Sequence, residues 1–403
     1  MSEKRNSRLA VQLTALTLAR LFLNTGLRMV YPFAPELSRG LGVPLASIYR
    51  LITLRNLTGF LSPLFGPLSE KYGRKPVILG SLAVFSLGCF LIVLWPAYWP
   101  LGATLAIISI TKVIFDPAMQ AYLGDTVSYD RRGRALAITE LAWAGAILAG
   151  APLVSLAIQR QGWTAPFLWM GLLVTGATLW LWRILPHSGQ GLGQAGNWQE
   201  IWRVVQTYPV IWAAALYIFL VMTANEILFI VYGNWMESSF SLSLTSLGLA
   251  TAVLGGAEIT GELFAGWSVD RFGKRPVILI TGLLNALLYA LIPFTSNTLT
   301  AALISLFAVF LTFETTVVGG VPLLTEIVPQ ARGVVMSVAL AAGALGRTVG
   351  SLGGPAIWEN AGMIGNGLVA AFIMAIALIV LATQIREADS AAREFQLDPL
   401  ELE

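Results

Sequence analysis

Long apolar runs recur from one end of this chain to the other, and they restrict its fold more than any other feature of the sequence. Each run is roughly 20 residues or longer, which as an α-helix spans the hydrocarbon core of a bilayer. Only 12% of the 403 residues are charged, whereas about a quarter is usual in soluble proteins. Because lipid offers the backbone no hydrogen-bond partners, such runs cross a membrane as helices. We therefore expect an all-α membrane protein with twelve transmembrane helices, at residues 9–33, 46–66, 75–96, 100–123, 133–158, 163–183, 208–235, 243–267, 276–297, 299–325, 333–357 and 361–385.

One connection, residues 186–207, is much longer than the others and separates six predicted helices from six. Its segment GLGQAG, residues 191–196, formally matches the dinucleotide-binding pattern GxGxxG, but no strand precedes it, so we interpret it as a flexible linker. The predicted domains are an N-terminal six-helix bundle, a cytoplasmic linker, and a C-terminal six-helix bundle with a short cytoplasmic tail, at residues 1–190, 191–207 and 208–403.

The basic residues indicate how the chain is oriented. Seventeen of the 25 lysines and arginines lie in connections or termini on one side of the predicted helices, and only Arg39 and Arg160 lie on the other. Connections rich in lysine and arginine stay in the cytoplasm. We expect a multi-pass protein of the cell (inner) membrane with both termini and the linker in the cytoplasm.

A short segment occurs twice, 200 residues apart. Residues 66–79 read GPLSEKYGRKPVIL and residues 266–279 read GWSVDRFGKRPVIL, and the same offset relates Arg132-Gly133 to Arg332-Gly333. Two unrelated domains would not keep one offset at two landmarks, so we infer two related halves, as in transporters built from repeats. We call residues 66–79 and 266–279 the signature loops.

Each signature loop combines glycines, an acid and a basic cluster. Glycine permits tight turning and close backbone approach, and Glu70 could accept hydrogen bonds at a helix N-terminus. Arg74 is placed to pair with an acid such as Asp125 at the end of the fourth helix. The simpler alternative is ordinary cytoplasmic positive charge. The predicted gating motif is Gly66, Glu70, Gly73, Arg74, Asp125, Gly266, Asp270 and Gly273.

These doubled loops resemble those of the major facilitator superfamily, and the resemblance covers essentially the whole chain. Tyr31-Pro32-Phe33-Ala34-Pro35 resembles the end of the first helix in the twelve-helix drug–proton antiporters of that family. Lys112 stands where that branch has arginine, and Gly150-Ala151-Pro152 replaces its Gly-Pro signature. The resemblance implies two pseudo-symmetric six-helix bundles that carry a small solute by alternating access. It also implies that the third, sixth, ninth and twelfth helices are peripheral.

Charged residues inside the predicted helices agree with that implication, because those four helices carry none apart from Lys75 and Arg183 at their ends. Such residues are costly in lipid and normally face the bundle interior or a water-filled cavity. The alternative is that they pair across the halves and hold one state shut. Trp143, Tyr217 and Tyr232 could also line a cavity. The candidate substrate- and proton-binding residues are Asn24, Arg28, Lys112, Asp116, Glu140, Glu226, Glu258, Glu262, Glu314 and Arg347.

The position of these residues along their helices suggests pairings. Arg20, Asn24 and Arg28 fall on one stripe of the first helix, and Glu258 and Glu262 share one face of the eighth. Lys112 and Asp116 share a face of the fourth helix and could neutralise each other. Glu226 and Glu314 lie on helices that border the central cavity of the family fold, which makes them the leading candidates to carry a proton. A separate ridge of Gly346, Gly350 and Gly354 suits close helix packing.

Other function classes lack their motifs. The sequence has no nucleophile–base motif of the kind that would indicate an enzyme, and no GxxxxGK[ST] loop, which an ATP-driven pump would need. Its single cysteine, Cys89, and single histidine, His187, are too few for a metal centre built from these residues. We expect no cofactor, no metal and no nucleic acid, with a proton gradient as the driving force. The expected protein is a monomer in the lipid bilayer that exports a small organic solute. The alternatives are facilitated uniport, proton-symport uptake of a small polar or zwitterionic solute, and a non-transporting sensor or scaffold.

Overall fold

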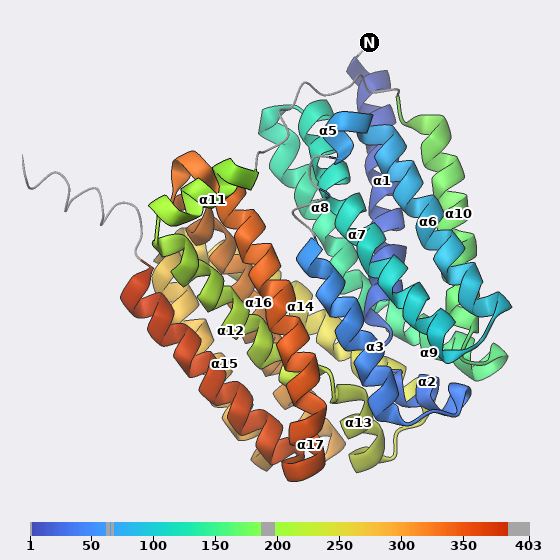
Figure 1. Ribbon diagram of the computed structural model, residues 1–403, viewed down its shortest axis with the longest axis vertical. Helices are drawn as coiled ribbons and strands as arrows, with labels where there is room; N and C mark the ends of the chain where they lie inside the picture. Colours follow the sequence, from blue (N-terminus) through green and yellow to red (C-terminus); the bar gives the residue numbers. More distant parts are fainter. Residues whose placement is uncertain (1, 62–64, 66–67, 187–197, 386–403) are drawn as a thin grey trace, which may run out of the picture. The chain divides into compact units, whose positions relative to one another are not determined.

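The computed structural model describes residues 2–61, 65, 68–186 and 198–385, and every regular element in that part of the chain is a helix. The all-α prediction is therefore confirmed for those residues. The helices of the first half (Figure 1) are α1 (Ser2–Arg28), α2 (Ala34–Leu41), α3 (Leu45–Thr58), the 3-10 helix η1 (Gly59–Leu61), α5 (Leu68–Tyr72), α6 (Arg74–Leu94), α7 (Tyr98–Thr126), α8 (Tyr129–Leu148), α9 (Gly150–Gln161) and α10 (Ala165–Ile184).

The helices of the second half begin with one inside the predicted linker. They are α11 (Trp198–Thr207), α12 (Val210–Phe229), α13 (Tyr232–Phe240), α14 (Leu244–Phe272), α15 (Lys274–Thr295), α16 (Leu299–Glu326), the 3-10 helix η2 (Pro329–Ala331) and α17 (Arg332–Gln384).

Nine segments among the described residues are long and apolar enough to cross a membrane. The last of them contains α17, which turns at Gly362, where φ is 56°, and so holds two helices, 332–361 and 363–384. The nine omit α1, which carries Arg20 and Arg28, and α3, which is 14 residues long. Adding these two and counting α17 twice gives the twelve helices that the sequence predicts.

Proline explains two of the differences between the predicted helices and the observed ones. The first helix stops at Arg28 rather than at residue 33, since Pro32 has no N–H and its ring clashes with the carbonyl four residues earlier. The predicted helix 133–158 divides into α8 and α9 at Ala149, and Pro152 likewise deprives the carbonyl of Leu148 of its helical donor. The predicted helix 208–235 is also divided, into α12 and α13.

The prediction of a flexible linker was wrong for residues 198–207, which form α11. In the sequence, Trp198, Ile201, Trp202 and Val205 have the i, i+3, i+4 and i+7 spacing that is typical of an amphipathic helix. The GxGxxG match lies outside the described residues.

Contacts between Cα atoms divide the chain into two compact units. We call Met1–Gly196 with Phe229–Gly256 the first unit, and Asn197–Leu228 with Ala257–Glu403 the second unit. The divisions fall at the end of α12 and at Gly256 inside α14. The domain boundaries expected from the sequence stay a prediction.

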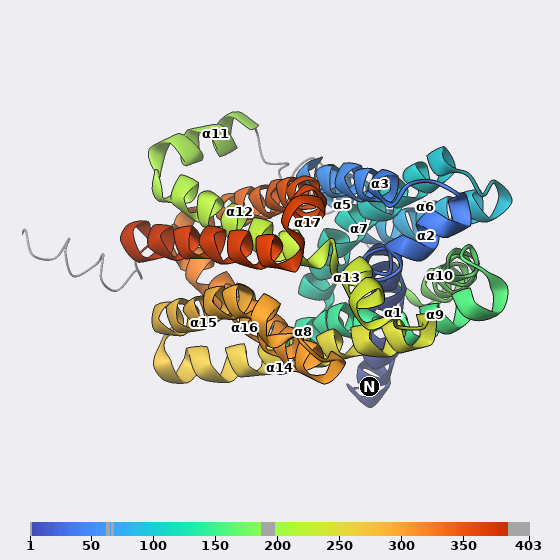
Figure 2. The ribbon, with the colours of Figure 1, turned by 90° about the horizontal axis from the view of Figure 1, so that it is seen from below.

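Each unit is built from long helices packed side by side (Figures 1 and 2). In the first unit α1 packs on α8 and α10, and α6 packs on α7 and α10. In the second unit α15 packs on α16 and α17. Large apolar side chains on α6, α10 and α15 are exposed, as the lipid-facing surface of a spanning helix requires. The charged side chains described below come mainly from other helices.

Candidate functional site

A stripe of polar side chains on α1 bonds α8 in the first unit. Arg20, Asn24 and Arg28 donate to the backbone carbonyls of residues 139, 142 and 143, over 2.9, 3.1 and 3.0 Å respectively. All three are buried. The predicted stripe is therefore present, and it attaches the first predicted helix to the fifth.

Four charged side chains form one cluster in the first unit. Arg20 bonds Asp116 through Nε at 3.2 Å and Glu140 through Nη1 at 2.8 Å, and Lys112 bonds the other oxygen of Asp116. The cluster joins α1, α7 and α8, and its two cations balance its two anions. Lys112 and Asp116 pair with each other, as their spacing on one helix predicted, and Arg20 shares the same carboxylate. Arg20 was not among the predicted site residues, although its place on one stripe with Asn24 and Arg28 was a signal.

The indole of Trp143 is covered by two cations. The guanidinium of Arg28 lies 4.2 Å from the ring centroid and the ammonium of Lys112 lies 5.4 Å from it. A tryptophan face attracts cations through its quadrupole. Trp143 on α8 therefore connects Arg28 to the charge cluster through a contact that spacing along one helix cannot reveal.

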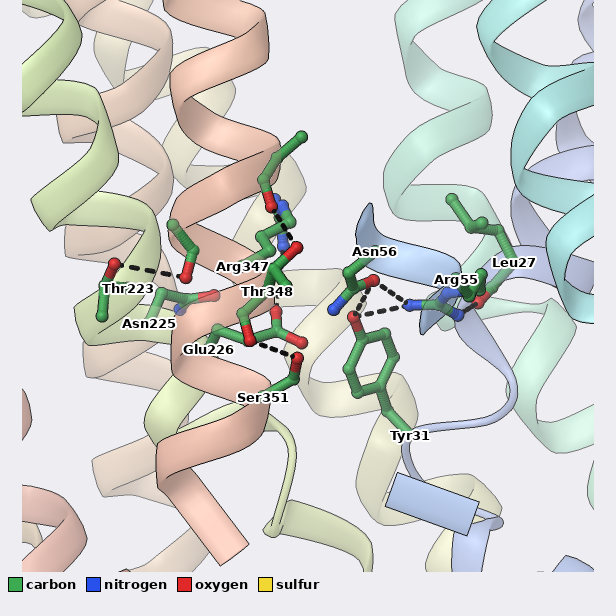
Figure 3. A network of polar contacts seen from close by, with 12 residues as sticks. Leu27, Tyr31, Arg55, Asn56, Thr223, Asn225, Glu226, Arg347, Thr348 and Ser351 are labelled. Atoms are coloured by element: carbon green, nitrogen blue, oxygen red, sulfur yellow. Dashed lines mark hydrogen bonds and ion pairs between the residues drawn. The ribbon is translucent and has the colours of Figure 1, made fainter. Parts of the chain in front are cut away.

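The second unit holds a buried acid–base pair. Glu226 on α12 is 0% exposed, and its Oε2 lies 3.4 Å from Nη1 of Arg347 on α17 (Figure 3). Both residues were predicted for the site, and the structure brings them together.

The predicted glycine ridge explains how α17 comes so close to α12. A Cβ at Gly346 would lie 2.3 Å from the carbonyl oxygen of Phe219, and one at Gly350 would lie 2.6 Å from Cβ of Glu226. Thr223 also donates to the carbonyl of Gly346 over 3.2 Å. Only glycine permits this contact, and the contact places Arg347 beside Glu226.

Glu314, another candidate acid of the second half, lies at a contact of α14 with α16. A Cβ at Gly261 would lie 2.9 Å from Cβ of Glu314, and Thr315 donates to the carbonyl of Gly261 over 3.2 Å. Gly261 stands between Glu258 and Glu262 in the sequence. Glu258 and Glu314 are buried and Glu262 is partly buried. Lys112, Asp116 and Glu140 are therefore brought together in the first-unit charge cluster, and Glu226 and Arg347 form a pair in the second unit. Asn24 and Arg28 bond α8, and the remaining candidates Glu258, Glu262 and Glu314 lie on α14 and α16.

The second glycine of each signature loop adopts the same backbone conformation. Gly73 has φ 87° and ψ 153°, and Gly273 has φ 86° and ψ 155°. This positive φ favours glycine. Gly266 has open space around it, so no close approach requires a glycine there, and Gly66 lies outside the described residues. The repeat in the sequence is thus a repeat in backbone geometry at the second position.

The basic residues of the two loops also make matching contacts. Arg74 pairs with Asp125, as predicted, through Nε and Oδ2 at 3.1 Å. In the second half, Lys274 pairs with Glu326 at the end of α16. The residue that follows each of these cations donates to a backbone carbonyl at or near the end of another helix. Lys75 donates to the carbonyl of Leu185 after α10, and Arg275 donates to the carbonyl of Ala382 near the end of α17. Cations suit helix C-termini, so each loop joins its helix to two neighbours.

Glu70 is not part of the Arg74–Asp125 pair, because the second bond of Arg74 goes to Ser69 Oγ at 2.8 Å.

Arg74→Gln and Asp125→Asn should each shift the ratio of inward-open to outward-open protein by less than about fivefold, since the Asp125 side chain is 60% exposed and such pairs contribute about 1 kcal/mol or less. The double variant should shift it no further. Spin-label distance measurements check this. Glu70→Gln should act additively with Arg74→Gln, and a non-additive result would show that Glu70 interacts with the Arg74–Asp125 pair. Asp270, which stands in the second loop where Glu70 stands in the first, is exposed.

On the side opposite the signature loops, one arginine joins α2 to α13 within the first unit. Arg39 bonds Glu36 at 2.6 Å and Glu237 at 2.5 Å. Partial burial lowers the pKa of Arg39, and its hydrogen bonds to the two carboxylates outweigh this, so the pKa lies above its usual value. Sequence reasoning missed this cluster because its partners are 198 residues apart. The sequence did contain a signal for it, because Arg39 is one of only two basic residues in the predicted connections on that side of the membrane.

The same region of the first unit contains close packing around the Tyr31-Pro32 segment. The rings of Tyr31 and Phe229 lie 4.4 Å apart, and a Cβ at Gly233 would lie 2.3 Å from the carbonyl oxygen of Pro32. The segment that ends the first helix is therefore in direct contact with α13.

Comparison with known proteins identifies the family. The model of the Major Facilitator Superfamily matches residues 16–232 and 214–399. The class C tetracycline resistance protein of Escherichia coli is 28% identical over 308 residues, which are 73% of this chain and 75% of that protein. The multi-drug resistance efflux pump PmrA homolog of Lactococcus lactis is 24% identical over 291 residues, covering 69% of this chain and 71% of that protein.

Among solved structures, a crystal structure of a D-xylose-proton symporter superposes with a TM-score of 0.80, covering 94% of this chain and 98% of that one. Its sequence identity of 17% supports the fold alone. The predicted fold is thereby confirmed, and the protein is a multi-pass membrane transporter and not an enzyme. With the family model matching both halves, this chain belongs to the major facilitator superfamily.

Proposed function

We propose that this protein is a secondary transporter that exports a small organic solute by alternating access in exchange for protons. The observation that carries the proposal is the pair of Glu226 and Arg347 inside otherwise apolar helices. A carboxylate that is fully buried needs either a counter-ion or a proton. If Arg347 moves away during the transport cycle, Glu226 must bind a proton, and this exchange of partners couples proton movement to the change of conformation.

Export is supported by the relatives in sequence, which are a tetracycline resistance protein and a multi-drug efflux pump. The orientation that we propose, with both termini in the cytoplasm of a cell-membrane protein, rests on the distribution of lysine and arginine. In that orientation the signature loops face the cytoplasm, and the Arg39 cluster lies on the outer side. Each set of pairs would stabilise one closed end of the transport pathway, and we propose that the protein acts as a monomer.

A gradient experiment tests proton coupling. In proteoliposomes with an imposed pH gradient, the wild type should accumulate tetracycline, the substrate named for the relative, against its concentration gradient. Glu226→Gln should abolish accumulation and keep exchange of labelled for unlabelled tetracycline, because the glutamine cannot lose a proton. Glu314→Gln is measured in parallel as the second candidate, and Glu359→Gln, an exposed acid on α17, is the matched control.

Facilitated uniport is the second candidate, favoured by the ion pairs of Asp116, Glu140 and Glu226, which give each acid a purely structural use. A wild type that equilibrates tetracycline but never accumulates it would establish uniport. A wild type that accumulates tetracycline while both glutamine variants also do so would exclude Glu226 and Glu314 as coupling sites. Movement of solute in the same direction as protons would replace exchange with symport.

A further inference from the structure

Arg55 on α3 is a buried cation with an unusual set of partners. It is 2% exposed, and none of the described carboxylates lies within ion-pair distance of it. We propose that Arg55 binds an anionic group of the transported solute, so that the substrates are small organic anions or zwitterions. This inference rests on the proposed transport function and adds the class of substrate.

The contacts of Arg55 are all with neutral groups (Figure 3). Nη1 donates to the carbonyl oxygen of Leu27 over 2.5 Å, and Nη2 donates to Tyr31 Oη and Asn56 Oδ1, each over 2.7 Å. The guanidinium carbon lies 4.9 Å from the centroid of the Tyr31 ring. The Nε–H donor is buried and has no acceptor among the described residues. Buried donors are normally satisfied, so this arrangement is incomplete.

Three other cations inside the helices differ from Arg55 in this respect. Arg20 bonds two carboxylates, Lys112 bonds one, and Arg347 bonds Glu226. Uncompensated charge inside a membrane protein is costly and marks functional positions. The chain supplies counter-ions to these cations, whereas Arg55 lacks one, which is what a site for an anionic ligand requires.

A purely structural reading gives Arg55 the task of capping α1. Its bond to Leu27 lies at the C-terminal end of that helix, where the dipole favours a cation. Capping does not need a planar fork of five donors, because the single ammonium of lysine can serve a helix end. A guanidinium matches the two oxygens of a carboxylate. We therefore assign Nε–H to one oxygen of the ligand's anionic group; where that group is a carboxylate, its second oxygen competes with Asn56 Oδ1 for Nη2.

Binding measured without any gradient tests the site. The probes are radiolabelled benzoate, benzamide and benzylamine, which share one ring and differ in charge, and the protein is the full chain in detergent. The wild type should bind benzoate about tenfold more tightly than benzamide, as a charge-assisted bond predicts. Arg55→Gln should reduce that preference to less than twofold. Arg50→Gln, an exposed arginine on the same helix, should leave it unchanged.

A second variant covers the case in which Arg55→Gln does not fold. Asn56→Asp keeps the shape of the side chain and places a carboxylate at the oxygen that already contacts Nη2. This internal anion should compete with benzoate and remove the preference while raising the midpoint of thermal unfolding. If Arg55 only caps α1, Asn56→Asp should leave benzoate binding unchanged.

The outcomes separate this inference from the proposed function. A wild type without preference for benzoate, or a preference that survives in Asn56→Asp and in any folded Arg55→Gln protein, overturns the anion site even if tetracycline is transported. A preference that depends on Arg55 in a protein that transports nothing would uphold the site and overturn the transport proposal.

Discussion

Arg347→Met is expected to destabilise the protein by about 2–3 kcal/mol, because it leaves the fully buried carboxylate of Glu226 without the cation beside it. Removing one partner of a buried pair usually costs about 3–5 kcal/mol. We expect a value at or below the lower end, since the Arg347 side chain is 28% exposed and the distance is 3.4 Å. Thermal unfolding of the protein in detergent measures the effect as a lower midpoint.

The double variant Glu226→Gln with Arg347→Met should recover most of that loss. Glutamine is neutral and methionine fills a similar volume, so neither charge remains buried and unpaired. Glu359→Gln is again the matched control and should leave the midpoint unchanged. If the double variant is as unstable as Arg347→Met, the loss comes from packing of the arginine stem, and the pair contributes little to stability.

Gly346→Ala is expected to cost about 2–3 kcal/mol through overpacking. Its new Cβ would lie 2.3 Å from the backbone oxygen of Phe219, so α12 and α17 must separate. Gly353→Ala, on the same helix, meets no atom within 4 Å. It should be neutral or stabilise the protein by about 0.5–1 kcal/mol, because alanine favours helix more than glycine does.

The two glycine variants are compared by thermal unfolding in one detergent. A second measurement tests the link to the site, because separating α12 from α17 should also move Arg347 away from Glu226. Gly346→Ala should therefore lower proton-driven accumulation in proteoliposomes, and Gly353→Ala should not. Equal unfolding midpoints for the two variants would show that the ridge does not hold these helices together.

Contacts within one helix and contacts between helix ends at loops could be predicted from the sequence. Lys112 and Asp116 are four residues apart, so a helix alone places them together. The pairing of Arg74 with Asp125 followed from two helix ends on one side of the membrane. The glycine ridge on α17 was also predictable, because three small residues at intervals of four lie on one face.

Contacts between distant helices were not predictable in the same way. The sequence places Glu140 and Trp143 on a helix and Glu237 just after one, but contains no information on which neighbouring helix each one meets. Arg20 reaches Glu140, and Arg39 reaches Glu237, only because separate helices are aligned at a particular height. Registers between helices are set by packing of many side chains at once, which periodicity within one helix does not encode.

The sequence alone determined that this chain is a membrane protein of twelve helices in two related halves. The length of an apolar run and the distribution of lysine and arginine are local properties of the sequence, and they decide which segments enter the bilayer and how these are oriented. It also determined which residues carry charge inside the membrane. The tertiary structure decided where helices break and which charges meet: Asp116 shared by two cations, Glu226 beside Arg347, and Arg55 among neutral acceptors. The reason is physical, since a buried charge is stabilised only by groups within a few ångströms, and only the folded chain brings those groups from different helices together.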